Sequence, residues 1–221
     1  MSRGLSGSRL VPLSIHGPAG TLEALLQEHG CLDHAIAALV CHPHPLYGGT
    51  MHNKVVQRAA AVLHALGAAV LRFNFRGVGK SAGRHDGGVG ELEDARAALG
   101  FLVERYPQAR RWLAGFSFGS WVASLLAAAE PGIERLIVIA PPVTSNDFAV
   151  LDTLAVPKLV LQGTGDDVCP PAALRERFER WAEPKTLVEI PGATHFFDRQ
   201  LGALADAMHE AISGAKGGGA S

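Results

Sequence analysis

RWLAGFSFGSWVASLLAAAE, residues 111–130, is the stretch of sequence that decides the fold. Residues 111–114 read as a short buried strand, and residues 120–130 are helix formers with no breaker before Pro131. Between them, residues 115–119 fit the G-x-S-x-G pattern, so the chain must turn sharply from strand to helix at Ser117. Such a turn strains the backbone and needs residues without bulk on either side, which Gly115 and Gly119 provide. Ser117 is therefore a candidate nucleophile, although a serine that only starts a helix also fits the pattern.

A serine nucleophile needs a histidine to take its proton and a carboxylate to orient that histidine. Asp166 follows the apolar strand pattern at 158–163, and the crevice beyond such strand ends is where open α/β sheets bind ligands. Its neighbour Asp167 fits the local role of hydrogen-bonding the backbone of the turn. Among the ten histidines, His195 stands apart because it follows the last predicted strand. We choose Ser117, Asp166 and His195 as the candidate catalytic residues.

These segments together resemble the α/β-hydrolase superfamily. Residues 115–119, 162–166 and 192–197 are similar to its nucleophile elbow, acid turn and histidine loop, in the same chain order. CHPHPLYGGTM at 41–51 resembles the loop after the third strand of a small His-Pro-His-Pro subgroup related to dienelactone hydrolases, and NFRGVGKS at 74–81 resembles the loop after the fourth strand. The resemblance spans about residues 36 to 200 and implies a serine hydrolase with a Ser-His-Asp triad.

The resemblance also implies an oxyanion hole of two backbone amides, one after the nucleophile and one from the loop at 41–51. Phe118 supplies the first. Pro43 and Pro45 have no N–H, which leaves His44 or Leu46 for the second. The resemblance favours Leu46, and His44 stays open.

Two other segments suggest alternative sites. Residues 41–52 hold one cysteine and three histidines, but the intervening prolines keep the chain extended and the paired cysteines of structural zinc sites are not present. In RGVGKS at 76–81, one residue separates the first glycine from the Gly-Lys pair, where a phosphate-binding loop needs four. We therefore expect both segments to shape loops, and we predict no metal, nucleotide or other cofactor.

The apolar patterns predict an α/β fold with a mostly parallel eight-stranded sheet flanked by helices on both faces. The predicted strands are Leu10–His16, Thr21–Leu26, Ile36–Cys41, Ala69–Asn74, Arg111–Gly115, Ile133–Ala140, Lys158–Gly163 and Thr186–Ile190. The predicted helices are Asn53–Leu66, Glu91–Tyr106, Phe118–Glu130, Pro171–Trp181 and Leu201–Ser213. The first two strands are joined by a turn of hairpin length at 17–20.

Length and composition fit one domain at 1–213 followed by a flexible glycine-rich tail at 214–221, because 221 residues that are 48% hydrophobic can bury a large core. A net charge of −1 with dispersed basic residues predicts no nucleic-acid or membrane surface. Neither a signal-peptide pattern nor the roughly 20 apolar residues of a membrane span are found, so we expect a cytoplasmic protein. The odd count of three cysteines argues against a disulfide framework. Nothing indicates the oligomeric state.

The short connection at 141–156 leaves no room for a lid domain between the sixth and seventh predicted strands. We therefore predict an open site whose partner is a small acyl substrate, an ester or thioester of modest size. A peptidase or an acyltransferase would use the same triad, and the fold also serves ligand-binding proteins without catalysis.

Overall fold

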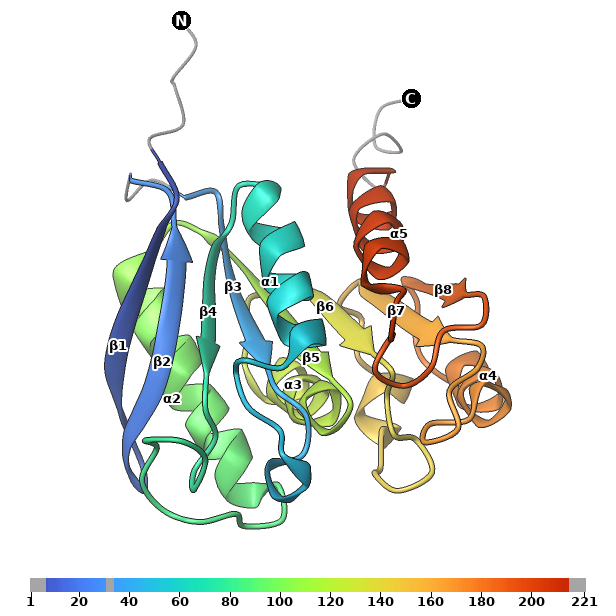
Figure 1. Cartoon of the computed structure of the whole chain (residues 1–221), viewed down its shortest axis with the longest axis horizontal. Coiled ribbons are helices and arrows are strands. Elements are labelled where there is room, and N and C mark those ends of the chain that lie inside the picture. The colour runs from blue at the N-terminus through green and yellow to red at the C-terminus, as the bar shows by residue number, and fades with distance from the viewer. Residues whose placement is uncertain (1–6, 31–33, 215–221) are drawn as a thin grey trace, which may run out of the picture.

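An eight-stranded sheet forms the centre of the molecule in the computed structural model, which describes residues 7–30 and 34–214 (Figure 1). The strand order is β1-β2-β4-β3-β5-β6-β7-β8. β1 pairs antiparallel with β2, and β2 with β4, whereas all later pairings are parallel. The strands are β1 Arg9–Gly17, β2 Gly20–Glu28, β3 Ile36–Cys41, β4 Ala69–Phe73, β5 Arg110–Phe116, β6 Ile133–Ile139, β7 Lys158–Gly163 and β8 Lys185–Ile190.

Burial along the strands follows from their place in the sheet. Every residue of β3, β4 and β7 is buried, as expected for parallel strands covered on both faces. In β2 the fully buried positions alternate with partly exposed ones, because one face of this strand packs on the core and the other faces solvent. The antiparallel hairpin of β1 and β2 therefore closes one edge of the sheet, with Gly17 paired to Gly20 at its turn.

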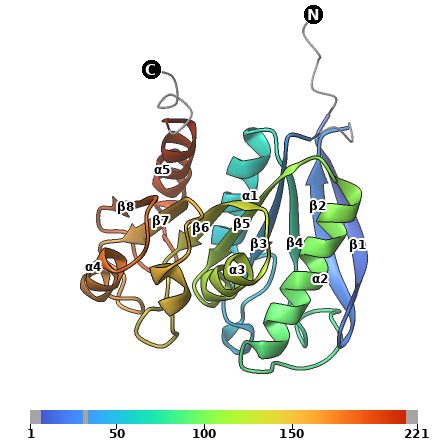
Figure 2. The ribbon, with the colours of Figure 1, turned by 180° about the vertical axis from the view of Figure 1, so that it is seen from behind.

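Helices cover both faces of the sheet (Figures 1 and 2). α1 and α5 pack on one face around a cluster that includes Val56, Leu63 and Met208. α2, α3 and α4 contribute to the opposite cluster, which includes Leu99, Leu126 and Leu174. The helices are α1 Lys54–Ala65, α2 Val89–Arg105, α3 Phe118–Ala129, α4 Pro171–Glu179 and α5 Leu201–Gly214.

The predicted elements are all present, with shifted ends that have local causes. α1 begins at Lys54 because the Asn53 side chain accepts hydrogen bonds from the first free amides of the helix. α2 begins at Val89 because the Glu91 carboxylate accepts the Gly88 amide, which caps the helix start. Between β6 and β7 the chain forms only the short 3₁₀ helix Ala149–Asp152, so the predicted absence of a lid agrees with the structure. The predicted tail at 214–221 lies, beyond Gly214, outside the described residues.

Candidate active site

The turn at Ser117 has the strained geometry that its sequence context predicts. Ser117 lies between the end of β5 and the start of α3 with φ 52 and ψ −125, a left-handed φ that is rare outside glycine. A Cβ on Gly115 would lie 2.1 Å from the Gly119 carbonyl oxygen, and one on Gly119 would lie 2.4 Å from the Cys41 and His42 carbonyl oxygens. Strand and helix therefore meet so closely that only glycine fits at both positions.

The three candidate catalytic side chains form a continuous chain of hydrogen bonds. His195 Nε2 lies 3.1 Å from Ser117 Oγ, and His195 Nδ1 lies 2.8 Å from Asp166 Oδ2. The loops after the last strands bring them together. Asp166 follows β7, His195 follows β8 and Ser117 follows β5, so all three lie at the carboxyl ends of parallel strands. Asp166 and His195 are both 4% exposed, which keeps water from competing for this contact. The arrangement has the geometry of an activated serine.

Four donors converge on the Asp166 carboxylate. Its Oδ1 accepts the backbone amides of Val168 (2.9 Å) and Cys169 (2.7 Å), while Oδ2 accepts the Gln162 side-chain amide (3.1 Å) as well as His195. Because all these groups donate to the two carboxylate oxygens, they hold the side chain in one fixed orientation. The neighbouring Asp167 is exposed and makes none of these contacts. The expectation that Asp167 hydrogen-bonds the backbone of the turn is therefore wrong, because Asp166 makes these bonds itself.

The backbone amides of Phe118 and His44 have no hydrogen-bond acceptor among the described residues. Phe118 is the first residue of α3, so its N–H has no partner within the helix. The His44 amide has no acceptor within residues 7–30 and 34–214, whereas the Leu46 amide donates to His44 Nδ1 at 3.2 Å. The predicted donor Leu46 lies in the short 3₁₀ helix Pro45–Tyr47, and its side chain is 69% exposed. Within this loop, the Leu46 amide is therefore already hydrogen-bonded, whereas the His44 amide has no acceptor among the described residues.

His42 holds this loop from inside. Its Nδ1 donates to the Pro43 carbonyl oxygen (2.6 Å) and its Nε2 accepts the Phe75 amide (3.0 Å), so both ring nitrogens are used by the backbone. Burial lowers the pKa of His42 to about 4, which keeps the ring neutral in this role. Burial also raises the pKa of the adjacent Cys41 thiol. His42 therefore shapes the loop through its two backbone bonds, as expected for the histidines of this segment.

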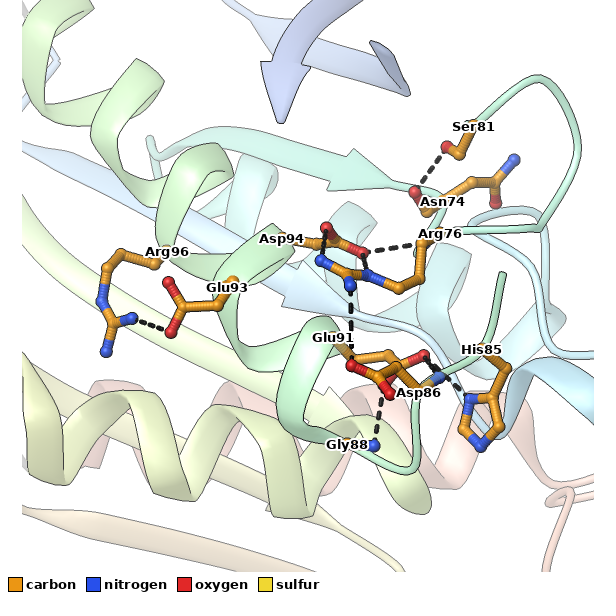
Figure 3. A network of polar contacts seen from close by, with 10 residues as sticks. All are labelled: Asn74, Arg76, Ser81, His85, Asp86, Gly88, Glu91, Glu93, Asp94 and Arg96. Atoms are coloured by element: carbon orange, nitrogen blue, oxygen red, sulfur yellow. Dashed lines mark hydrogen bonds and ion pairs between the residues drawn. The ribbon is translucent and has the colours of Figure 1, made fainter. Parts of the chain in front are cut away.

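The loop after β4 is held by ion pairs and hydrogen bonds (Figure 3). The Arg76 guanidinium donates from Nε and Nη2 to the fully buried Asp94 carboxylate at 3.0 and 2.8 Å. Ser81 Oγ donates to the Asn74 carbonyl oxygen at 2.6 Å. Arg76 and Ser81 of this glycine-rich segment therefore hold the loop in place.

A pocket of about 300 Å³ opens beside Ser117. Ser117 and His195 lie in its wall, and Tyr47, Val168 and Phe196 supply apolar surface. The pocket lining is completed by Pro43, His44, Gly48, Gly49 and Asn53. A larger hollow of about 390 Å³ lies over β1 and β2 and includes neither Ser117 nor His195.

Metal ligation at this site competes with the hydrogen bonds described above. Within the described parts of the chain, Asp166, Cys169 and His195 form a group whose ligand atoms all lie within 4.8 Å of one another. His195 Nδ1 already bonds to Asp166, and burial raises the pKa of the Cys169 thiol, which disfavours the thiolate that a metal needs. The donor set fits the hydrogen-bonded triad better than a metal.

Sequence reasoning missed two residues of this region. Gln162 is buried in β7 and directs its amide at Asp166, and a polar residue inside an apolar strand was the available signal. His85 lies with its ring centroid 4.8 Å from that of His44, although 41 positions separate them in the chain. No local pattern marks such a contact, because it depends on how the loops after β3 and β4 meet.

No helix in the portion of the chain that the structure describes has the length and apolar character needed to cross a lipid bilayer.

Comparison with known proteins adds independent information. A family model described as serine aminopeptidase, S33, matches residues 36–151. An uncharacterized protein of Rickettsia prowazekii is 38% identical over 204 residues, which cover 88% of this chain and 85% of that protein. A solved structure of an α/β serine hydrolase homologue from Coxiella burnetii has a TM-score of 0.87 and 39% identity, covering 96% of this chain and 100% of its own. Another, an α/β serine hydrolase without lid from Xanthomonas campestris, has a TM-score of 0.86 and 38% identity, with 96% and 97% covered.

Proposed function

Since this chain belongs to the α/β-hydrolase superfamily, through the serine aminopeptidase S33 family whose model it matches, we propose that it is a serine hydrolase that cleaves carboxylic esters or thioesters of modest size. The observation that carries the proposal is the hydrogen-bonded chain from Ser117 Oγ through His195 to Asp166. A serine held on a strained turn against a buried histidine and carboxylate has the geometry of nucleophilic catalysis.

In the proposed first half-reaction, Ser117 Oγ attacks the acyl carbonyl carbon while His195 Nε2 takes its proton. Asp166 accepts the His195 Nδ1–H, which keeps Nε2 unprotonated and directed at Ser117. The imidazolium then gives its proton to the leaving oxygen or sulfur, and the acyl group stays on Ser117. Water attacks this acyl-enzyme with His195 as the base, which releases the acid and restores the serine.

The tetrahedral intermediates carry a negative oxygen that needs two positioned donors. We assign the Phe118 amide as one of them, as the sequence predicted. For the other we now assign His44 in place of Leu46, because the Leu46 amide is bonded to His44 Nδ1 and the His44 amide is free. Using Leu46 would require that bond to break.

The pocket supports substrates of modest size. Its volume of about 300 Å³ lies at the lower end of the range for small-molecule sites, roughly 300–1,000 Å³. Tyr47 and Val168 are 85% and 56% exposed, so the pocket opens to solvent and larger substituents can extend outward. Acyl groups of a few carbons therefore fit, with the remainder of the substrate outside.

An aminopeptidase activity, which the name of the matching family model suggests, fits the pocket less well. An aminopeptidase must bind the free α-ammonium group of its substrate, for which a carboxylate is the usual partner. The residues that line the pocket, all of them described in the structure, include neither aspartate nor glutamate. The lining therefore favours uncharged acyl groups.

The proposal is tested by stopped-flow hydrolysis of p-nitrophenyl acetate and butyrate beside alanyl p-nitroanilide, with wild-type protein and Ser117→Ala. We expect a burst of about one p-nitrophenolate per chain with the esters, no burst in Ser117→Ala, and little anilide cleavage. Anilide cleavage faster than ester cleavage would favour the peptidase. Ester binding without turnover would favour a non-catalytic ligand-binding protein.

A further inference from the structure

His44 is one of the residues that line the pocket with Ser117 and His195, and the proposed mechanism uses only its backbone amide. Resting on the proposed function, we propose that the His44 imidazole is a specificity-determining donor whose Nε2–H binds a neutral oxygen in the acyl group of the substrate. The preferred substrates would then be esters or thioesters of acids that carry an ether, hydroxyl or keto oxygen near the carbonyl.

The loop fixes which nitrogen of His44 carries the proton. The Leu46 backbone amide donates to Nδ1 at 3.2 Å, and an amide N–H can only donate, so Nδ1 is unprotonated. A neutral imidazole with a bare Nδ1 carries its hydrogen on Nε2. Burial, together with the nearby His85, lowers the pKa of His44 and keeps the ring neutral. His44 therefore presents one N–H donor.

Packing fixes the direction of the ring. The ring centroid of His44 lies 4.8 Å from Phe118, 4.6 Å from Tyr47 and 4.8 Å from His85. His85 is itself anchored, because its Nδ1 lies 2.8 Å from the carboxylate of Glu91, whose side chain is fully buried (Figure 3). The same carboxylate accepts the backbone amides of residues 86 and 88, and these bonds fix its position and thereby that of the His85 ring. A donor held in this way is positioned before the substrate arrives.

His44 Nε2 has no hydrogen-bond partner in the part of the chain that is described, while its residue lines the pocket with Ser117 and His195. Two other polar side chains belong to the lining. Tyr47 is 85% exposed, and the Asn53 side-chain oxygen accepts the amides that begin α1, which leaves Asn53 Nδ2 as a further donor. Of these donors, His44 is the one whose ring is held both by the loop and by the neighbouring aromatic rings.

The charges around the pocket favour a neutral oxygen over a carboxylate. None of the described lining residues is lysine or arginine, and the nearby Lys54, whose Nζ lies 5.9 Å from the centroid of the Phe196 ring, is already paired with Asp198. The Glu91 carboxylate lies 2.8 Å from His85 Nδ1 and places negative charge on that side, whereas the Asp86 carboxylate is paired with Arg76 at 3.8 Å. An uncharged acceptor gains the hydrogen bond without this repulsion.

The acyl group is the part of the substrate that faces His44. His195 must protonate the leaving group, so the leaving group lies on the side of His195 and the neighbouring Phe196. The oxyanion lies at the His44 and Phe118 amides in the proposed mechanism. The acyl substituent then extends toward the wall formed by His44 and Tyr47.

The test uses two pairs of esters in which one methylene is replaced by oxygen. The pairs are p-nitrophenyl butyrate with methoxyacetate, and p-nitrophenyl pentanoate with 3-methoxypropanoate. The kcat/KM ratio of the oxygen ester to its carbon partner is measured in wild-type protein, in His44→Phe and in the control Tyr47→Phe. Comparing ratios between proteins cancels the intrinsic reactivity of each ester.

We expect His44→Phe to lower the ratio about tenfold in at least one pair, as the loss of one hydrogen bond predicts, and Tyr47→Phe to leave it unchanged. Equal ratios in wild type and His44→Phe for both pairs would overturn the inference while the butyrate turnover upholds the hydrolase. No turnover of any ester by wild-type protein would instead defeat the proposed function.

A second measurement does not depend on a His44 variant that folds. ¹⁵N NMR of the imidazoles in Ser117→Ala reports the tautomer of His44 directly, and titration with ethyl methoxyacetate or ethyl butyrate reports contact with the ring. The inference requires a protonated Nε2 whose signal shifts with the methoxy ester and less with butyrate. A proton on Nδ1, or equal shifts with both esters, would overturn it.

Discussion

Replacement of Asp166 by asparagine changes one oxygen to an amide group and leaves the shape of the side chain almost intact. If the new NH₂ faces the backbone amides of Val168 and Cys169, two buried donors lose their acceptor, at about 1–3 kcal/mol each. If it faces His195 instead, one contact with Gln162 is lost and the two backbone bonds survive. The second orientation is therefore preferred.

In that orientation the asparagine donates to His195 Nδ1, so the imidazole proton must move to Nε2. A protonated Nε2 cannot accept the Ser117 proton. For a triad with the wrong tautomer the expected loss in kcat is about 10⁴-fold, equivalent to roughly 5–6 kcal/mol of transition-state stabilisation. The free energy of unfolding should fall by only about 1–3 kcal/mol, because only the Gln162 contact is broken.

The assay is kcat for p-nitrophenyl butyrate, with stability measured by urea unfolding in the same buffer. Asp167→Asn is the matched control, because Asp167 is exposed and its change should leave kcat within about twofold. An Asp166→Asn enzyme that keeps more than a tenth of wild-type kcat would refute the reasoning. So would an Asp167→Asn enzyme that is the disabled one of the two.

Three further predictions concern stability. Gly119→Ala should prevent soluble expression or lower the free energy of unfolding by several kcal/mol, because the new Cβ would lie 2.4 Å from the His42 carbonyl oxygen. Gly100→Ala is the control: a Cβ there has nothing within 4 Å, and the free energy of unfolding in urea should rise by about 0.5–1 kcal/mol. A tolerated Gly119→Ala would contradict the close approach of helix and strand. Burial lowers the pKa of His42 to about 4 in the folded protein, while in the unfolded chain the pKa keeps its ordinary value of 6.5. As the pH falls, the unfolded chain therefore takes up the proton first, and the free energy of unfolding should fall by about 3 kcal/mol between pH 7 and pH 4. His42→Gln should lose less stability over the same range in urea unfolding, and an equal loss would contradict the neutral role. Asp94→Ala should cost about 3–5 kcal/mol by leaving the Arg76 guanidinium without its buried partner, and the double variant with Arg76→Met should recover part of this loss in the same assay; additive losses would show that the pair is not coupled.

Much of the fold followed from local patterns. The apolar runs of the parallel strands, the hairpin at 17–20 and the helix that starts after Ser117 each depend on neighbours in the chain, and the predicted lid-less α/β-hydrolase fold is confirmed. Ser117, Asp166 and His195 were chosen because each follows a predicted strand, and parallel strands bring the loops at their carboxyl ends together. The structure places the three side chains in hydrogen-bond contact, and their catalytic role stays a prediction. Placement in the His-Pro-His-Pro subgroup stays a prediction.

The remaining features depend on contacts between distant segments. The proposed choice of the His44 amide over the Leu46 amide rests on the turn after residue 44, where the Leu46 N–H donates to the His44 ring. The contact of His44 with His85, which is bonded to the buried Glu91, forms only when two loops and the start of α2 meet. Neither follows from residue spacing, because both require the positions of loops in three dimensions.

The central claim is that Ser117 is an activated nucleophile. Intact-protein mass spectrometry after treatment with a fluorophosphonate tests it most directly, with Ser117→Ala treated alongside and peptide mapping of the product. The account predicts one adduct per chain, located on Ser117 and not formed in the variant. An unmodified wild-type protein, or an adduct that forms equally in Ser117→Ala, would contradict it.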